Sequence, residues 1–160
     1  MVCMFYQKEV NDNYSTPVEY LRVIEPYIPK EFIINDPFYF NGLVKDNWRQ
    51  IGRDIIHEDK DFFNSAHDGD IFVSNPSFSN LKEIFIKLFE LEKPFILLIP
   101  IQKIAQLKIQ KIINDKELQM IVSPIYMGFI NSDGEQTRCS SQYFCYVCWK
   151  LNLDRDLMFI

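Results

Sequence analysis

Short apolar runs that end in a polar residue recur along the first half of the chain. They cover residues 32–36, 54–58 and 70–74, and their apolar positions are isoleucine, phenylalanine and valine. Such residues favour strands, and uninterrupted apolar runs of this length are typical of strands that are buried on both faces. We therefore predict three buried strands here, a very short strand at 61–63, and a longer strand at 94–101.

Helices are predicted between these runs. Residues 16–19 combine a capping threonine, a proline at the first helical position and a glutamate that closes a capping box, so a helix should extend to about residue 26. A second helix is predicted over 42–51. Residues 80–83 form another capping box ahead of apolar positions at one-face spacing, and a fourth helix is predicted over about 103–113.

The last third of the chain predicts two more strands, near 118–127 and 142–151, joined through the turn-rich segment 131–134. Alternating strands and helices indicate an α/β protein with a mostly parallel sheet and helices on both faces. The two final strands should form an antiparallel hairpin at the edge of that sheet. We expect seven strands in a single domain spanning residues 1–160.

Three polar residues follow buried strands: Asp36, Glu58 and Asn75. In open, mostly parallel sheets, ligands bind beyond the carboxyl ends of the strands, where these residues are expected to meet. The segment from Asp36 to Gly42 also suits a tight turn in which backbone amides approach a nucleotide-like ligand, because Gly42 adopts positive φ without strain. A simple turn between strand and helix accounts for the same residues.

Composition narrows the possible partners. The net charge is −5 and the pI is near 5.0, which argues against unaided binding to duplex nucleic acid, although a local basic patch or a partner subunit could supply it. No signal peptide is apparent, and the longest apolar stretch, at 94–101, is too short to span a bilayer. We expect an intracellular protein, cytoplasmic or nuclear, that binds no membrane.

No metal is expected. Cys145 and Cys148 lie three residues apart on a predicted strand, so their side chains should point to opposite faces of the sheet and cannot share an ion. Cys3 and Cys139 complete the set, and with no secretory signal we expect four free thiols. His57 and His67 are too few and too separated to indicate a general base, and His57 is expected to be a residue of the sheet.

The segment Ser74-Asn75-Pro76-Ser77-Phe78 resembles the Asn/Asp-Pro-Pro-Tyr/Phe motif of S-adenosylmethionine-dependent amino-methyltransferases, which methylate amines such as adenine N6. The resemblance implies that Asn75 and the Pro76 carbonyl accept hydrogen bonds from the target amine and that Phe78 stacks on the target ring. It also implies a Rossmann-like methyltransferase sandwich. Ser77 replaces the second proline of the motif, and Asn-Pro-Ser-Phe is also a common turn.

Further segments are similar to the same family. The resemblance implies that Tyr14 and Thr16 lie beside the methionine end of the cofactor, that Glu58 binds the ribose, and that Asp61 and Phe62 contact the adenine. The cofactor S-adenosylmethionine would then be held by Tyr14, Thr16, Asp36, Phe38, Gly42, Glu58, Asp61 and Phe62. Which of Glu58, Asp59 and Asp61 reaches the ribose stays open, and a surface cluster of carboxylates is the alternative.

The resemblance implies an S-adenosylmethionine-dependent N-methyltransferase, with adenine N6 of DNA or RNA as its acceptor. The chain has no segment left over for a target-recognition domain, so a partner subunit or a short single-stranded substrate is expected. Two alternatives remain: a catalytically inactive methyltransferase-like subunit, favoured by Ser77, and an amide methyltransferase that acts on a protein glutamine.

Overall fold

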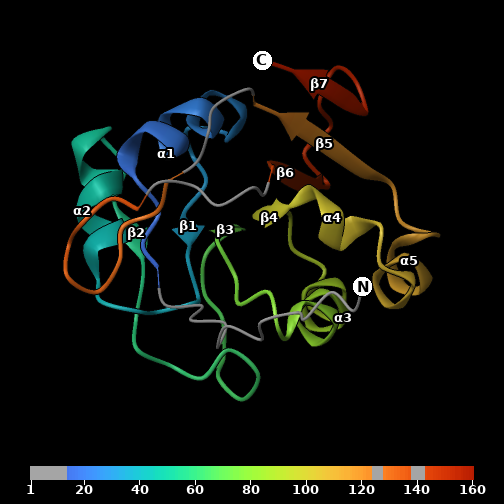
Figure 1. Cartoon of the computed structure of the whole chain (residues 1–160), viewed down its shortest axis with the longest axis horizontal. Helices are drawn as coiled ribbons and strands as arrows, with labels where there is room; N and C mark the ends of the chain where they lie inside the picture. The colour runs from blue at the N-terminus through green and yellow to red at the C-terminus, as the bar shows by residue number, and fades with distance from the viewer. Residues whose placement is uncertain (1–13, 124–127, 138–142) are drawn as a thin grey trace, which may run out of the picture.

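A seven-stranded sheet between two layers of helices forms the body of the protein in the computed structural model, which describes residues 14–123, 128–137 and 143–160 (Figure 1). One face is covered by α1 (Val18–Ile24) and α2 (Leu43–Gln50), and a short 3₁₀ helix, η1 (Glu25–Tyr27), follows α1. The other face is covered by α3 (Leu81–Leu91), α4 (Ile101–Ile104) and α5 (Leu107–Ile113). In the described part of the chain, no helix has the length and apolar character needed to cross a membrane.

The sheet has the strand order β2-β1-β3-β4-β6-β5-β7. Strands β2, β1, β3 and β4 are parallel neighbours, β6 is antiparallel to both β4 and β5, and β7 is parallel to β5. The predicted α/β class, the mostly parallel sheet and the antiparallel pairing of the last two predicted strands are therefore confirmed. The bounds are β1 Ile34–Asn35, β2 Ile55–Ile56, β3 Ile71–Ser74, β4 Phe95–Pro100, β5 Leu118–Val122, β6 Phe144–Trp149 and β7 Leu157–Phe159.

The structure corrects one predicted strand and adds one that was not predicted. Residues 61–63 form a turn, because the Asp61 carboxylate accepts a hydrogen bond from the amide of Phe63 at 2.8 Å and another from Asn64 at 2.6 Å. An aspartate that bonds the backbone two residues ahead stabilises a turn against a strand. The seventh strand is instead β7, at the C-terminal end of the chain, and it takes the edge position that the hairpin was expected to occupy.

Smaller corrections concern the helices and the hairpin. The predicted helix over 103–113 is two helices, α4 and α5, and neither α1 nor α3 has a side-chain cap, so the two predicted capping boxes are not formed. The N-cap of α1 is Pro17, which has no hydrogen-bonding side chain. The parts of the predicted strands at residues 124–127 and 142 lie outside the described residues.

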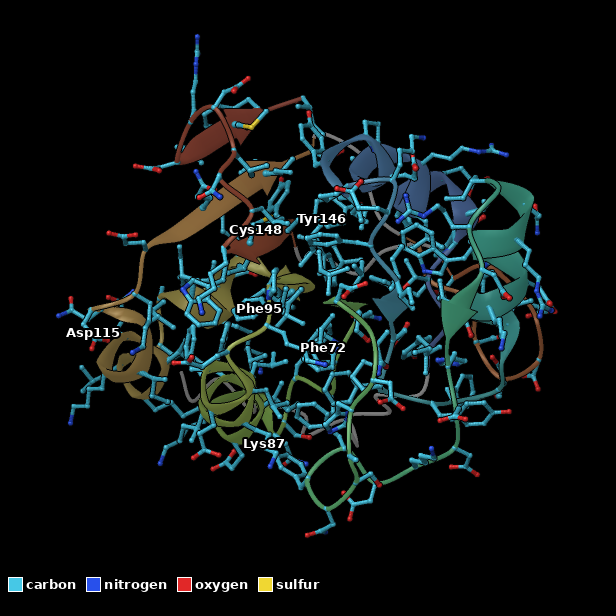
Figure 2. All side chains as sticks on the ribbon, turned by 180° about the vertical axis from the view of Figure 1, so that it is seen from behind. Phe72, Lys87, Phe95, Asp115, Tyr146 and Cys148 are labelled. Atoms are coloured by element: carbon cyan, nitrogen blue, oxygen red, sulfur yellow. The ribbon has the colours of Figure 1, made fainter. Side chains whose placement is uncertain are left out.

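Successive side chains along each strand point to opposite faces of the sheet, which divides the hydrophobic core into two halves. In β4, Ile96 and Leu98 face α1 and α2, whereas Phe95, Leu97 and Ile99 face α3 and α5. Figure 2 shows the same division, with Phe72 and Phe95 on the side of α3 and with Tyr146 and Cys148 on the other side. A strand buried on both faces needs apolar residues at every position, which explains the uninterrupted run Phe95–Ile99.

Gly69 fixes the approach to β3. Its φ is +89°, and a Cβ atom at this position would lie 2.9 Å from the main-chain oxygen of Ile33. That oxygen accepts a hydrogen bond from the amide of Asp70 at 2.8 Å, and the Asp70 carboxylate accepts one from the amide of Ile33 at 2.8 Å. The start of β3 therefore lies so close to the start of β1 that no side chain fits at Gly69.

We expect Gly69→Ala to lower the free energy of unfolding in urea clearly more than Gly52→Ala. Gly52 also has a positive φ, +81°, but its Cβ position is open, so only the backbone cost of about 1–2 kcal/mol applies there. The contact with Ile33 should add roughly 1–3 kcal/mol at Gly69. Equal losses for the two variants would contradict the close approach of the two strands.

Candidate functional site

The carboxyl ends of β1 and β3 bring Asp36 and Asn75 together. The two strands are parallel neighbours, and the Ser74 hydroxyl, at the end of β3, donates a hydrogen bond to the Asp36 carboxylate. Two small cavities lie here. We name them the core-side cavity, which reaches Ile96 and Tyr146, and the loop-side cavity, which reaches Tyr14 and Phe38. They share four lining residues: Thr16, Asp36, Val44 and Asn75.

Asp36 is a carboxylic acid in an almost closed environment, with 5% of its surface exposed. Burial raises the pKa of this carboxyl to about 6, because the charged form loses its hydration there. The rise is opposed by His57 and by hydrogen bonds from the Ser74 hydroxyl and from the amide of Phe38, which lies 3.3 Å from the carboxylate. Among the described residues, Asp36 is the one carboxylate that lines either of the two cavities.

His57 belongs to the same site, which the sequence analysis did not foresee. Its ring nitrogen Nδ1 donates a hydrogen bond to the main-chain oxygen of Asp36 at 2.9 Å, and the ring lies 4.9 Å from that of Tyr39. The side chain is buried and lines the loop-side cavity. No sequence signal pointed to it, because the juxtaposition depends on strand register: β1 and β2 pair with Asn35 opposite Ile56, and the next residues, Asp36 and His57, therefore lie side by side.

Asn75 presents an acceptor without a donor. Its side-chain oxygen Oδ1 is fully buried and has no hydrogen-bond partner among the described residues. Leaving a buried acceptor unpaired costs about 1–3 kcal/mol, so such an atom requires an explanation. Pro76, which follows, is buried, and a proline restricts the backbone of the residue before it, here Asn75. The backbone that carries the Asn75 acceptor is therefore restricted by the residue that follows it.

The other two residues of the motif are engaged within the protein. The hydroxyls of Ser77 and Ser79 are hydrogen-bonded at 2.8 Å. The Phe78 ring is half-buried, packs against both halves of the core and lies 5.9 Å from the Phe144 ring. As it stands, Phe78 closes the end of the core and does not present a free face to a ligand.

The N-terminal side of the site is built by the loops before α1 and α2. Tyr14 and Thr16 line the loop-side cavity together with Phe38. The main-chain oxygen of Thr16 accepts a hydrogen bond from the Asn47 side chain at 2.9 Å, which attaches this loop to α2. Gly42 is the N-cap of α2 with φ +78°, as the predicted turn requires, but it does not line either cavity.

Besides Gly42, three predicted cofactor residues lie outside the two cavities: Glu58, Asp61 and Phe62. Glu58 lines a separate cavity with Asn35 and Pro37, and its carboxylate is 2.5 Å from the Lys60 ammonium, which lowers the pKa of Glu58. Because side chains alternate along a strand, His57 faces the Asp36 side of the sheet and Glu58 faces the other side.

Asp61 is exposed and hydrogen-bonded within its own turn, and hydrogen bonds from Asn64 and Phe63 lower its pKa. Phe62 is buried, and its ring lies 4.7 Å from that of Phe38.

The two cavities are small. The core-side cavity has a volume of about 10 Å³ and the loop-side cavity about 20 Å³. A cavity of about 10–15 Å³ has room for one water molecule, whereas pockets for cofactors enclose roughly 300–1,000 Å³. The polar groups of a ligand site are present at the rim of the sheet, and the side chains around them leave room for little more than water.

The described residues contain no cluster of three or more histidine, cysteine or acidic side chains that could hold a metal ion. Cys145 and Cys148 are free and buried on opposite faces of the sheet, as their spacing predicts. Burial raises the pKa of each thiol to about 12, so neither is a reactive thiolate at neutral pH. Cys3 and Cys139 lie outside the described residues.

Comparison with known proteins adds no assignment at this point, because no protein-family model and no curated protein sequence matches the chain.

The raised pKa of Asp36 makes stability depend on pH. Because the folded state holds this proton more tightly than the unfolded state, the carboxyl stabilises the fold fully below pH 3.8, and the contribution is lost as the pH rises through about 6. We therefore expect the free energy of unfolding of the wild type to fall relative to that of Asp36→Asn, by up to about 3 kcal/mol between about pH 4 and pH 7. Chemical denaturation of both proteins at several pH values measures the difference, and parallel curves would contradict it.

Proposed function

We propose that the chain is an S-adenosylmethionine-dependent methyltransferase that acts on an exocyclic amine, with adenine N6 in nucleic acid as the acceptor. The observation that carries the proposal is the Asn75 oxygen, which is buried at the carboxyl edge of the sheet and has no donor among the residues that the structure describes. It occupies the motif position that the resemblance assigns to polarisation of the target amine. The mostly parallel sheet with its antiparallel β6 is consistent with the Rossmann-like sandwich that the resemblance implies.

An amine is the group that this acceptor suits. The amino group of adenine is a weak nucleophile because its lone pair is delocalised into the ring. A hydrogen bond from that group to Asn75 Oδ1 draws the lone pair out of the ring, and the Pro76 main-chain oxygen offers a second acceptor. Acceptors fixed before the reaction stabilise the developing charge without reorganisation. When bound, the cofactor would supply an electrophilic methyl group to the amine.

The residues that would hold the cofactor are those that already line the two cavities. Asp36 offers a carboxylate for hydroxyl or ammonium groups, and Tyr14, Thr16 and Phe38 form the adjoining wall. The polar groups fit such a ligand, and the volume does not, so binding requires the wall to move. The two cavities share Thr16, Asp36, Val44 and Asn75, and displacement at this partition would join them.

A second candidate function is a methyltransferase-like subunit without catalytic activity. Two observations favour it: the cavities at the site hold little more than water, and the Phe78 ring is packed against Phe144. In this case the acidic chain would act as a binding partner within a larger complex. The two functions differ in whether cofactor binds and whether Asn75 is needed for methyl transfer.

Cofactor binding is the first test. We expect S-adenosylhomocysteine to bind with micromolar affinity in calorimetry and to raise the melting temperature of the wild type, by the mass-action effect of a ligand that binds only the folded state. Asp36→Asn should weaken binding roughly tenfold or more, because it removes the carboxylate that lines the cavities. Asp61→Asn is the matched control, since that carboxylate is exposed and lies outside both cavities, and it should bind as the wild type does.

Absence of heat and of a thermal shift at saturating S-adenosylhomocysteine would rule out the enzyme and leave the inactive subunit. Loss of binding in Asp61→Asn with full binding in Asp36→Asn would contradict the assignment of the cofactor to the two cavities.

Methyl transfer is the second test. With radiolabelled S-adenosylmethionine and an adenine-containing single-stranded oligonucleotide, we expect Asn75→Ala to lower kcat on the order of 100-fold while cofactor affinity stays within a few-fold of wild type. Asn75→Asp keeps an acceptor and should retain much more activity than Asn75→Ala. A glutamine-containing peptide in a parallel reaction tests the amide acceptor. Equal rates for wild type and Asn75→Ala would remove Asn75 from the chemistry.

A further inference from the structure

We propose that the outer surface of α4 and α5 binds the sugar–phosphate backbone of a single-stranded nucleic acid. This surface is defined by Lys103, Lys108 and Lys111, and we call it the lysine surface. The inference rests on the proposed function, because it supplies the site for the acceptor strand that the function requires.

Charge is distributed unevenly along the chain. Residues 93–114 contain four lysines and no aspartate or glutamate, in a protein whose net charge is −5. The Lys93 ammonium is hydrogen-bonded inside the protein, where it donates to the main-chain oxygens of His67 and Gly69 at 2.8 and 2.7 Å. The three lysines of the lysine surface form no ion pair with any described residue. Their charges are available to a polyanion.

The fold places these charges beside the candidate site. Helix α4 begins at Ile101, directly after the carboxyl end of β4, and β4 is the parallel neighbour of β3, which leads into Asn75. Lys103 therefore lies near the same edge of the sheet as the Asn75 acceptor, and α5 continues from there along the flank beside α3 (Figure 1). Lys108 and Lys111 are exposed and lie three residues apart, so they occupy one side of α5.

The neighbouring helix does not neutralise this surface. The α3 helix packs beside α5 and carries two lysines and two glutamates, so it adds no net charge. A strand that enters the site at Asn75 with one base unstacked would extend along α4 and α5 with its phosphates against the three ammonium groups. Phosphate neutralisation by lysine supplies much of the affinity of proteins for single strands.

An anionic membrane would also attract lysines, but the apolar side of α5 is not available to it. Ile109 is fully buried, and Ile112 and Ile113 pack on the core that α5 shares with α3. On α4 and α5 themselves, the large hydrophobic side chains that face outward are Leu107, which is 71% exposed, and Ile101. A helix that binds at a membrane surface needs a continuous apolar face to insert, and α5 uses its apolar face inside the protein.

The test compares two pairs of lysines by fluorescence anisotropy with a labelled single-stranded oligonucleotide, in the absence of cofactor. Lys108→Gln/Lys111→Gln removes two charges from the lysine surface, and Lys30→Gln/Lys45→Gln removes two charges elsewhere as the matched control. We expect the first pair to weaken binding roughly tenfold near 0.1 M salt and to reduce the slope of log affinity against log salt by about 1.4, since each phosphate contact contributes about 0.7. The control pair should change neither quantity by a comparable amount.

Three outcomes would overturn the inference. The two double variants could lose the same oligonucleotide affinity, or the wild type could fail to bind the oligonucleotide. The third is that Lys108→Gln/Lys111→Gln weakens binding only to vesicles of phosphatidylserine and phosphatidylcholine and not to the oligonucleotide. Circular dichroism verifies that both pairs fold. Because cofactor is absent, failure here is distinct from failure of the calorimetric test, and a chain that binds S-adenosylhomocysteine but not the oligonucleotide would keep the proposed enzyme and lose this surface.

Discussion

The edge of the sheet depends on how one buried carboxylic acid is held. Asp36 receives a hydrogen bond from the Ser74 hydroxyl of the neighbouring strand, and its main-chain oxygen accepts one from His57 on the strand at the other side. Its amide donates to the main-chain oxygen of Ile56 at 2.9 Å. One residue thus connects the carboxyl ends of three parallel strands. A buried carboxylate is costly unless its oxygens are bonded, so the partners around Asp36 cannot relax independently.

The position of Asn75 follows from this arrangement. Ser74 is held by Asp36 at the end of β3, Pro76 restricts the backbone of the residue before it, and Asn75 lies between the two. Its backbone is therefore restrained on both sides, and its side-chain oxygen lies where none of the described residues donates to it. An acceptor that could rotate freely would find a partner in water or in the backbone.

Much of the fold could be predicted because it follows from local patterns. The apolar runs and the turn at Gly42 are determined within a few residues, and they gave the correct strands and helices around Asp36 and Asn75. The errors arise where distant contacts decide. The Asp61 carboxylate bonds the backbone of its own turn, which replaces the predicted strand. The three residues of β7 have no pattern that predicts a strand, because the strand forms only by pairing with β5. The face on which Glu58 and His57 lie depends on the register of β2 against β1, and the packing of Phe78 depends on Phe144, which is far away in the sequence.

The unpaired oxygen and the buried acid also indicate what kind of ligand the edge of the sheet can select. The cost of isolating Asn75 Oδ1, about 1–3 kcal/mol, is already present in the folded protein, so a ligand that brings an N–H donor relieves it, whereas a ligand of the same shape without a donor does not. Sites that contain unpaired polar groups discriminate much more strongly than apolar pockets, which distinguish one methylene by only about 1–3 kcal/mol. The cavities around Asp36 have room for about one water each, so a larger ligand has to displace residues that line them, Thr16 and Val44 among them. In the proposed function, a donor on the ligand would bond Asn75 Oδ1 and so contribute part of the free energy that opening the cavity requires.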